Sequence, residues 1–265
     1  MKKLIGFFSL LILVSCVKAT SKAPVEEHLP DVSSGEERTN VLIYGGPGSW
    51  KAEIESLKKI LLENHATYEV LTAQELNEMS QEDYSNYDAI LFAGGDAPTV
   101  RAALDKETRI QIREAVQKMG LSYLGFCAGA WLAVAPKPEP GEDVAYGLGV
   151  VEGPLLEPNF LTGEGKLFAL DRALFADGTE RNLLWYGGPV TYQNPGTVVV
   201  KYSDGTPAIS QVESGQGLVI MSGLHPAANK LILGQIGIYN KEAIAPEIAW
   251  ALLEAAIAKK KLSTF

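Results

Sequence analysis

Short apolar runs alternate with longer amphipathic segments along the first half of the chain. Four of the apolar runs have the length of buried strands: Val41–Tyr44, Tyr68–Leu71, Ala89–Ala93 and Leu121–Phe126. After the first run, Ile54, Leu57 and Leu61 recur at helical spacing. The segment up to Met119 predicts two further helical stretches, which end at Gly120. Because strands alternate with helices, we expect a parallel sheet with helices on both faces.

The pattern changes between Leu148 and Gln216. Glycine, proline and aromatic residues surround short runs such as Thr197–Tyr202 and Ala208–Val212, which predict antiparallel strands and hairpins. Gly217–Ser222 predicts a last buried strand, and a final amphipathic helix is expected from about Ala245 to Lys260. The predicted fold class is therefore α/β, with an antiparallel β-rich excursion in the second half.

The first residues are typical of a secretory signal. Lys2 and Lys3 precede an apolar run from Leu4 to Val14, which is too short for a stable membrane span. The run ends in Leu-Val-Ser before Cys16, and this resembles the bacterial lipoprotein box, in which the cysteine is acylated and becomes the mature N-terminus. We predict a lipoprotein signal peptide over residues 1–15 and lipidation of Cys16. The alternative is an ordinary signal peptide with an incidental cysteine.

Three regions follow from this interpretation. Residues 16–40 are rich in Ser, Thr, Pro, Glu and Lys without an apolar period, which predicts a lipidated flexible tether. Residues 41–265 are long enough for one well-buried domain.

The residue after Cys16 bears on the location of the protein. Val17 stands where an acidic residue would favour inner-membrane retention. The expected location is the cell envelope, at the outer membrane facing the periplasm if the cell is Gram-negative.

Charge and cysteine content exclude several function classes. The formal net charge is −9, and removal of Lys2 and Lys3 would make it more negative. An acidic chain without a basic stripe is a poor nucleic-acid binder. With Cys16 lipidated, Cys127 has no partner for an internal disulfide. No Cys, His or Asp spacing suggests a metal site, and no cofactor is expected.

The thiol of Cys127 lies in a tight turn, Gly125–Ala130, between a predicted strand and a predicted helix. Such an elbow lifts a nucleophile above the sheet, and flanking glycines let the backbone fold sharply and approach closely. His225 follows the last buried strand. We interpret Cys127 and His225 as a catalytic Cys–His pair. The alternatives are a small buried cysteine and a structural histidine, but the glycines on both sides of Cys127 favour an exposed elbow over a buried one.

Glycine-rich turns follow the other parallel strands, and carboxyl ends of parallel strands meet at one edge of a sheet. We expect Gly94, Gly95, Asp96 and Ala128 to line the pocket near Cys127. The N–H groups of Gly95 and Ala128 would hold an oxyanion. The alternatives are a tight turn at the two glycines and a helix N-cap at Asp96.

Four other aromatic or histidine positions are interpreted structurally. Tyr44, Trp131 and Tyr186 are predicted to pack rather than to contact substrate. His65 follows a predicted helix and is expected at the surface.

Three motifs together resemble a known family. They are Val41–Gly48, Ala93–Pro98 and Gly125–Ala130, and Tyr186–Pro189 is similar to a fourth, glycine-rich segment. The chain resembles the class I glutamine-amidotransferase-like superfamily, most closely the N-terminal domain of eukaryotic biotin–protein ligases. The resemblance implies a flavodoxin-like sheet with Cys127 at the elbow. No biotin-ligase catalytic domain follows, so biotin transfer is not implied.

The chain departs from the superfamily pattern at two positions. Glutamine amidotransferases carry a substrate-holding Gln four residues after the cysteine, where this chain has Trp131. Their histidine is followed by Pro-Glu, whose acid orients the imidazole, whereas Ala227 stands here. Another carboxylate or a backbone carbonyl could take this role, and Asp96 is one candidate by location. Glutamine-dependent amide transfer is therefore not predicted.

The sequence supports two functions of different classes. The first is a lipid-anchored envelope hydrolase that uses Cys127 and His225 to attack an amide or related acyl bond in a small-molecule or peptide-like substrate. The second is a non-catalytic binding module that keeps the pocket for a small ligand or a partner.

Overall fold

The computed structural model describes residues 40–139, 142–161, 167–194 and 196–265. The predicted signal peptide, Cys16 and all of the tether except residue 40 lie outside the described residues, so the lipoprotein interpretation stays a prediction. Within the described part, no helix has the length and apolar character needed to cross a membrane.

In the first half of the chain, the elements follow the order that the hydrophobic pattern predicts. In the second half, most of the elements are strands. The helices are α1 (Lys51–Glu63), α2 (Ala73–Glu78), α3 (Ala97–Ala103), α4 (Lys106–Met119), α5 (Ala128–Ala133), α6 (Lys230–Gln235) and α7 (Pro246–Ala258), with 3-10 turns η1 (Glu82–Asn86) and η2 (Lys241–Ala243). The first strands are β1 (Asn40–Tyr44), β2 (Thr67–Leu71), β3 (Ala89–Phe92), β4 (Ser122–Phe126), β5 (Val134–Ala135), β6 (Val151–Glu152) and β7 (Glu157–Pro158). The remaining strands are β8 (Ala169–Phe175), β9 (Glu180–Trp185), β10 (Pro189–Val190), β11 (Val198–Lys201), β12 (Pro207–Ser214), β13 (Gly217–Ser222) and β14 (Leu224–His225).

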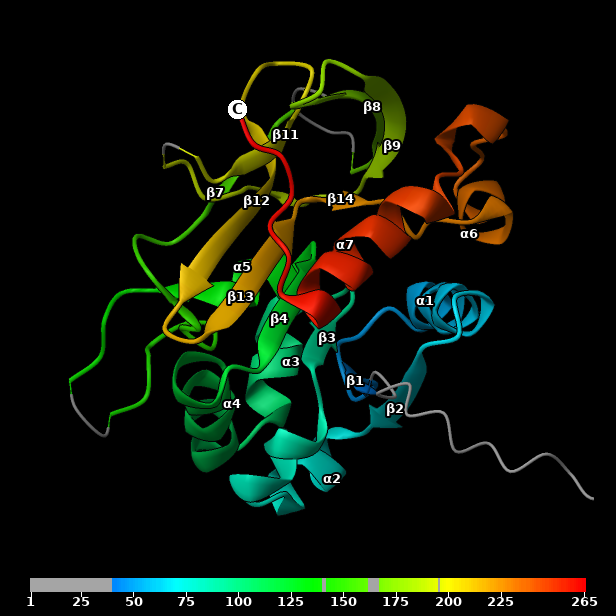
Figure 1. Cartoon of the computed structure of the whole chain (residues 1–265). Coiled ribbons are helices and arrows are strands. Elements are labelled where there is room, and N and C mark those ends of the chain that lie inside the picture. The colour runs from blue at the N-terminus through cyan, green and yellow to red at the C-terminus, as the bar shows by residue number, and fades with distance from the viewer. Residues whose placement is uncertain (1–39, 140–141, 162–166, 195) are drawn as a thin grey trace, which may run out of the picture. The chain divides into compact units, whose positions relative to one another are not determined.

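One ten-stranded mixed sheet organises the described unit, in the order β14-β9-β8-β11-β12-β13-β4-β3-β1-β2 (Figure 1). Strands β2, β1, β3, β4 and β13 are parallel, and this strand order is the one found in flavodoxin-like sheets. Strands β12, β11, β8 and β9 continue the sheet in antiparallel pairs. The predicted fold class, with its antiparallel excursion, is confirmed.

Both faces of the parallel half are buried. Residues alternate between the faces of a strand, so Val41 and Ile43 pack in one apolar cluster while Leu42 and Tyr44 pack in the other. The first cluster lies under α1 and α7, and the second lies under α2, α3, α4 and α5. This explains why the first strands read as continuous apolar runs rather than as alternating ones.

The antiparallel half curls back toward the parallel half. Only Gly223 separates β13 from β14, yet β13 pairs with β4 and β12 whereas β14 pairs with β9. Leu224 lies opposite Trp185 in this last pair. The sheet must therefore bend until the end of β9 approaches the end of β13, and this brings Tyr186 close to His225.

The predicted and observed elements differ mainly in detail. The final helix ends at Ala258 rather than Lys260, because Lys259 takes a left-handed conformation (φ 50°). The helix α6 and the β8–β9 hairpin were not predicted individually. The six residues of α6 are too few to show a helical period.

Candidate active site

Cys127 lies at a strained bend between β4 and α5. Its φ of 46° and ψ of −97° are unfavourable for a residue with a side chain, and its N–H donates to the carbonyl of Ser222 at 2.7 Å. Gly125 and Gly129 do not share this strain. They are glycines because a Cβ at Gly129 would overlap the carbonyl oxygen of Phe92, and one at Gly125 would overlap Gly129. The predicted elbow is confirmed, and close backbone approach explains its glycines.

The sulfur of Cys127 is covered rather than open to solvent. Cys127 is 6% exposed, and its Sγ donates to the carbonyl oxygen of Tyr186 at 3.3 Å. The expectation that flanking glycines leave this elbow exposed is therefore wrong. The reason is the curled antiparallel half, which places the residue after β9 over the thiol. Cys127 is free of disulfide pairing in the described residues.

His225 ends β14 and is almost fully buried. Its Nδ1 lies 2.8 Å from Oε1 of Glu53, a residue of α1 whose side chain is itself fully buried. The other carboxylate oxygen of Glu53 accepts a hydrogen bond from the backbone N–H of Gly94 at 2.6 Å. Glu53 therefore has the role that the sequence analysis left open for an orienting acid.

A second contact fixes the same helix against the histidine segment. The hydroxyl of Ser56, one turn after Glu53, donates to the carbonyl oxygen of Ala227 at 2.6 Å. Residues three apart in a helix share a face, so this face of α1 holds both the imidazole and the backbone beyond it.

The surroundings of His225 favour its protonated form. Burial alone would lower the pKa of His225, but the charge of Glu53, the nearby Cys127 sulfur and the hydrogen bond with Glu53 outweigh it. Together they raise the pKa of the imidazole from 6.5 to about 10. At neutral pH His225 is therefore an imidazolium paired with Glu53.

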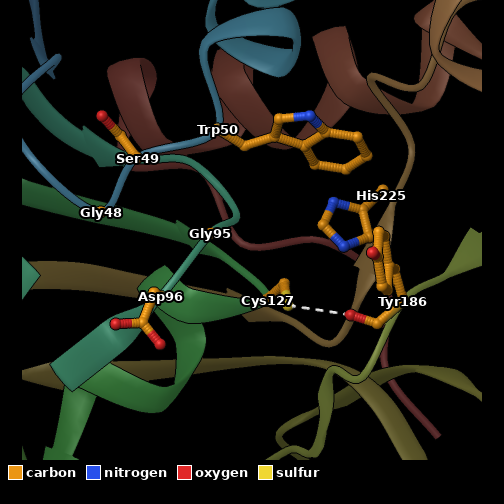
Figure 2. Close-up of a pocket in the computed structure, with 8 residues that line it drawn as sticks. All are labelled: Gly48, Ser49, Trp50, Gly95, Asp96, Cys127, Tyr186 and His225. Atoms are coloured by element: carbon orange, nitrogen blue, oxygen red, sulfur yellow. Dashed lines mark hydrogen bonds between the residues drawn. The ribbon is translucent and has the colours of Figure 1, made fainter. Parts of the chain in front are cut away.

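Cys127 and His225 line one cavity of about 500 Å³, together with Gly48, Ser49, Trp50, Gly95, Asp96 and Tyr186 (Figure 2). The Nε2 atom of His225 is buried and has no hydrogen-bond partner among the described residues. Because Nδ1 is held by Glu53, Nε2 is the ring nitrogen left to exchange a proton with the sulfur or with a bound molecule.

Aromatic rings enclose the imidazole. The ring of Trp50 contacts that of His225 edge-on at a centroid distance of 5.1 Å and that of Tyr186 at 5.8 Å. Figure 2 shows the Trp50 indole across the imidazole from Cys127, with Tyr186 beside the ring. These rings cover part of the imidazole and restrict the direction from which a substrate can approach.

The glycine-rich turn after β3 only partly meets its predicted role. Gly95 and Asp96 line the cavity, but the N–H of Gly94 is committed to Glu53, so Gly94 is not an oxyanion donor. Asp96 caps α3 by accepting from the N–H of Thr99 at 3.0 Å, and it does not contact the histidine. The suggestion that Asp96 orients the imidazole is wrong, and the N-cap alternative is confirmed.

Ala128 is the first residue of α5, so its N–H precedes the hydrogen bonds of the helix itself. The bridge between Ser49 and Gly95 uses the groups on either side of Gly95, namely the carbonyl of Gly94 and the N–H of Asp96. The N–H groups of Gly95 and Ala128 remain the predicted oxyanion donors.

The predictions for the aromatic residues have different outcomes. Tyr44 is fully buried and stacks on Phe92, and His65 is exposed, as expected. Trp131 and Tyr186, predicted to be packing residues, instead line cavities that reach Cys127. Large aromatic rings are usually buried. Trp131 instead follows the bend at Cys127, Tyr186 follows the end of β9, and both positions border the cavities.

Two residues that contact His225, Glu53 and Trp50, were not predicted from the sequence. Glu53 lies four residues before Leu57, on the apolar face of the first predicted helix. A carboxylate on an apolar helix face is a detectable signal for a buried partner. Trp50 carried no comparable signal, because it precedes the helix and its contacts depend on the position of His225.

Comparison with known proteins gives a partial family match. Residues 39–136 match the family model described as biotin-protein ligase, N terminal. The matched stretch contains the β1 and β3 turns, Glu53 and Cys127, and it ends before Tyr186 and His225. No curated protein matches the chain.

Among solved structures, a candidate GMP synthase subunit from Thermoplasma acidophilum is similar at 10% identity, over 84% of this chain and 96% of that chain, with a TM-score of 0.48. A cytoplasmic protein from Salmonella typhimurium is similar at 13% identity, over 82% and 98%, with a TM-score of 0.45. An exo-beta-1,4-mannosidase from Opitutaceae bacterium strain TAV5 is similar at 13% identity, over 83% of this chain but 36% of that chain, with a TM-score of 0.41. The functional assignment therefore depends on the site itself.

Proposed function

We propose that the protein is a cysteine-dependent hydrolase of an amide or related acyl bond. One observation carries the proposal. The free thiol of Cys127, on a strained elbow, shares a cavity with the buried His225. The Nδ1 atom of His225 is in turn held by the buried carboxylate of Glu53. Nucleophile, base and orienting group in this order are the general arrangement for nucleophilic catalysis by a thiol.

The reaction begins with Cys127 as a thiolate beside the imidazolium of His225, whose Nε2 carries a proton. The thiolate attacks the carbonyl carbon of the substrate and forms a C–S bond. The N–H groups of Gly95 and Ala128 stabilise the resulting oxyanion. The bond to the leaving nitrogen or oxygen then breaks, and the proton on Nε2 passes to that atom.

In the second half, water attacks the thioester on Cys127 and gives a proton to Nε2 of His225. The C–S bond breaks, the carboxylic acid leaves, and the thiolate–imidazolium pair is restored. The net reaction adds one water across the acyl bond. It needs no cofactor and no ammonia-accepting domain, and it transfers neither an amide nitrogen nor biotin.

Glu53 is a positioning residue in this scheme. Its Oε1 keeps the Nδ1 proton in place, so Nε2 faces the cavity in every protonation state of the cycle. The backbone N–H of Gly94 holds the second carboxylate oxygen, which fixes the direction of the first. The imidazolium charge next to the sulfur also favours the reactive thiolate.

Alkylation of Cys127 tests the pair directly. Wild-type protein is expected to react with iodoacetamide at Cys127, and His225→Gln is expected to slow this reaction by about ten- to a hundredfold, because the imidazolium no longer stabilises the thiolate. The measurement is the rate of adduct formation by mass spectrometry at neutral pH. The matched control is His65→Gln, which changes an exposed histidine. Equal rates in wild type and His225→Gln would rule out the pair.

We also propose that the domain is held at a membrane by acyl chains on Cys16, in the cell envelope. The support is the order of basic residues, apolar run, lipobox-like residues and polar tether in the sequence. Two or more acyl chains give durable attachment, whereas one chain binds only marginally.

Cys16→Ser is expected to prevent lipidation and normal processing, so that the protein is found unanchored or as an uncleaved precursor. The measurement is the mass of the mature N-terminus after expression in a bacterium with a lipoprotein pathway. Cys127→Ser serves as the control, because it removes the other cysteine and leaves the signal intact. An unmodified N-terminus at any residue other than Cys16 in the wild type would disprove the anchor.

A further inference from the structure

A second, larger cavity of about 740 Å³ adjoins the catalytic one. The two share four lining residues, Gly95, Asp96, Cys127 and Tyr186. The second cavity, here called the apolar pocket, includes Pro98, Trp131, Leu132, Leu155, Leu156 and Leu167 in its walls. Its volume is in the range of pockets that enclose small organic molecules.

The apolar pocket offers little charge to a ligand. Only two charged side chains line it in the part of the chain that the structure describes, Asp96 and Arg101. Asp96 is engaged as the cap of α3. Arg101 donates to Asp143 at 3.1 Å and to the carbonyl of Val144 at 2.6 Å. A ligand group that enters would therefore exchange water mainly for apolar surface, which favours an uncharged, apolar group.

Several large apolar side chains in the walls of the apolar pocket are exposed to solvent. Leu155 is 44% exposed, and Tyr146 and Leu167 are more exposed still. Exposed apolar side chains gathered around one opening are typical of a surface that a ligand covers. The catalytic cavity differs from this pocket, because the imidazole of His225 lines it.

The position of His225 decides which part of a substrate lies where. His225 lines the catalytic cavity but not the apolar pocket, whereas Cys127 lines both. The leaving atom must reach Nε2 to receive its proton, so the leaving group occupies the catalytic cavity. The acyl part stays bonded to the sulfur of Cys127, which also lines the apolar pocket.

We propose that the apolar pocket binds the acyl part of the substrate, and that this part is a long aliphatic or aromatic group without charge. This inference rests on the proposed hydrolase function. It names the substrate class as acyl compounds much larger and less polar on the carbonyl side than a glutamine side chain or an acetyl group.

Ester hydrolysis with a constant leaving group tests the proposal. The p-nitrophenyl esters of acetate, butyrate and octanoate are compared by kcat/KM with the full chain. Each buried methylene is expected to contribute up to about fourfold, so octanoate should exceed acetate by at least about tenfold. In Leu155→Asp, the ratio of octanoate to acetate should fall by at least about tenfold, because a charge then lines the pocket. The matched control is Leu231→Asp, which alters an exposed leucine of α6 outside both cavities and should keep the wild-type ratio.

Two further experiments distinguish a wrong assignment of the apolar pocket from a failure of the proposed hydrolase function. A series of acetate esters with alkyl leaving groups of increasing length should show little dependence on length. A strong dependence there, with none on the acyl side, would overturn the assignment. If no ester shows turnover that depends on Cys127, the proposed hydrolase function fails. Binding of octanamide and acetamide to Cys127→Ala, followed by tryptophan fluorescence, then decides the pocket alone. Octanamide binding at least about tenfold tighter supports an apolar site, and equal affinities overturn it.

Discussion

Cys127→Ala is expected to reduce acyl-bond hydrolysis by at least about a thousandfold, because it removes the thiol that forms the covalent intermediate. Among the described residues, the cavity lining contains one sulfur, that of Cys127, and its hydroxyls belong to Ser49 and Tyr186. The measurement is kcat/KM for a panel of amide, ester and thioester substrates. Alanine is close in size to cysteine, so the unfolding midpoint should change little and folding can be checked in the same samples.

Cys127→Ser is the companion variant. It keeps the shape of the side chain but replaces the thiol by a hydroxyl, which is a far weaker nucleophile beside an imidazolium. Its activity should fall nearly as much as that of Cys127→Ala. Turnover that survives in Cys127→Ala would disprove the proposed mechanism. No turnover in any variant, combined with binding of small amides, would favour the non-catalytic binding module.

Glu53→Gln is expected to destabilise the fold by about 3–5 kcal/mol, because it removes one charge from a buried pair. Both neighbours of the carboxylate, the Nδ1–H of His225 and the N–H of Gly94, are donors. Glutamine offers one acceptor oxygen where the carboxylate offers two. One buried donor must therefore lose its partner. Urea unfolding measures the difference.

Glu55→Gln is the matched control, since Glu55 lies two residues away on the same helix and pairs with Lys58 at the surface. An exposed pair of this kind contributes at most about 1 kcal/mol. A similar loss in both variants would show that Glu53 has no special role in the site.

The pH dependence distinguishes a positioning role from a merely structural one. The pKa of His225 is raised from 6.5 to about 10 in the folded protein. The stabilisation from its protonation is therefore complete below about pH 6.5 and is lost as the pH rises toward 10. In Glu53→Gln the largest contribution that raises this pKa is gone, and burial then lowers it. The stability difference between wild type and variant should therefore shrink between neutral pH and about pH 10. A difference independent of pH would contradict this account.

Loss of the orienting acid should also appear in catalysis. With Nδ1 unsupported, the neutral imidazole can hold its proton on Nε2 and cannot then act as a base. Glu53→Gln is therefore expected to lower kcat more than it raises KM, and to shift the pH profile of kcat/KM to lower pH.

The parallel half of the fold was predictable from the sequence because its signals are local. Buried parallel strands read as continuous apolar runs, and the helices between them keep an apolar period. The elbow of Cys127 was predictable for a similar reason, since glycines flank it on both sides within one turn. Its strand-end position also predicted that Gly95 and Asp96 would lie near it, and both residues line the same cavity as Cys127.

The remaining site features depend on contacts between segments far apart in the sequence. The acid beside His225 comes from α1, 172 residues away, and no local pattern connects the two. The cover over the thiol depends on how far the antiparallel strands curl before β9 meets β14. A sequence records which residues are apolar and where turns occur, but not how twist and bend accumulate across ten strands. The sequence by itself therefore indicated Cys127, His225 and the sheet edge at which they meet. Only the tertiary structure decided which carboxylate orients the histidine, which residues enclose it, and that an apolar pocket opens beside the thiol.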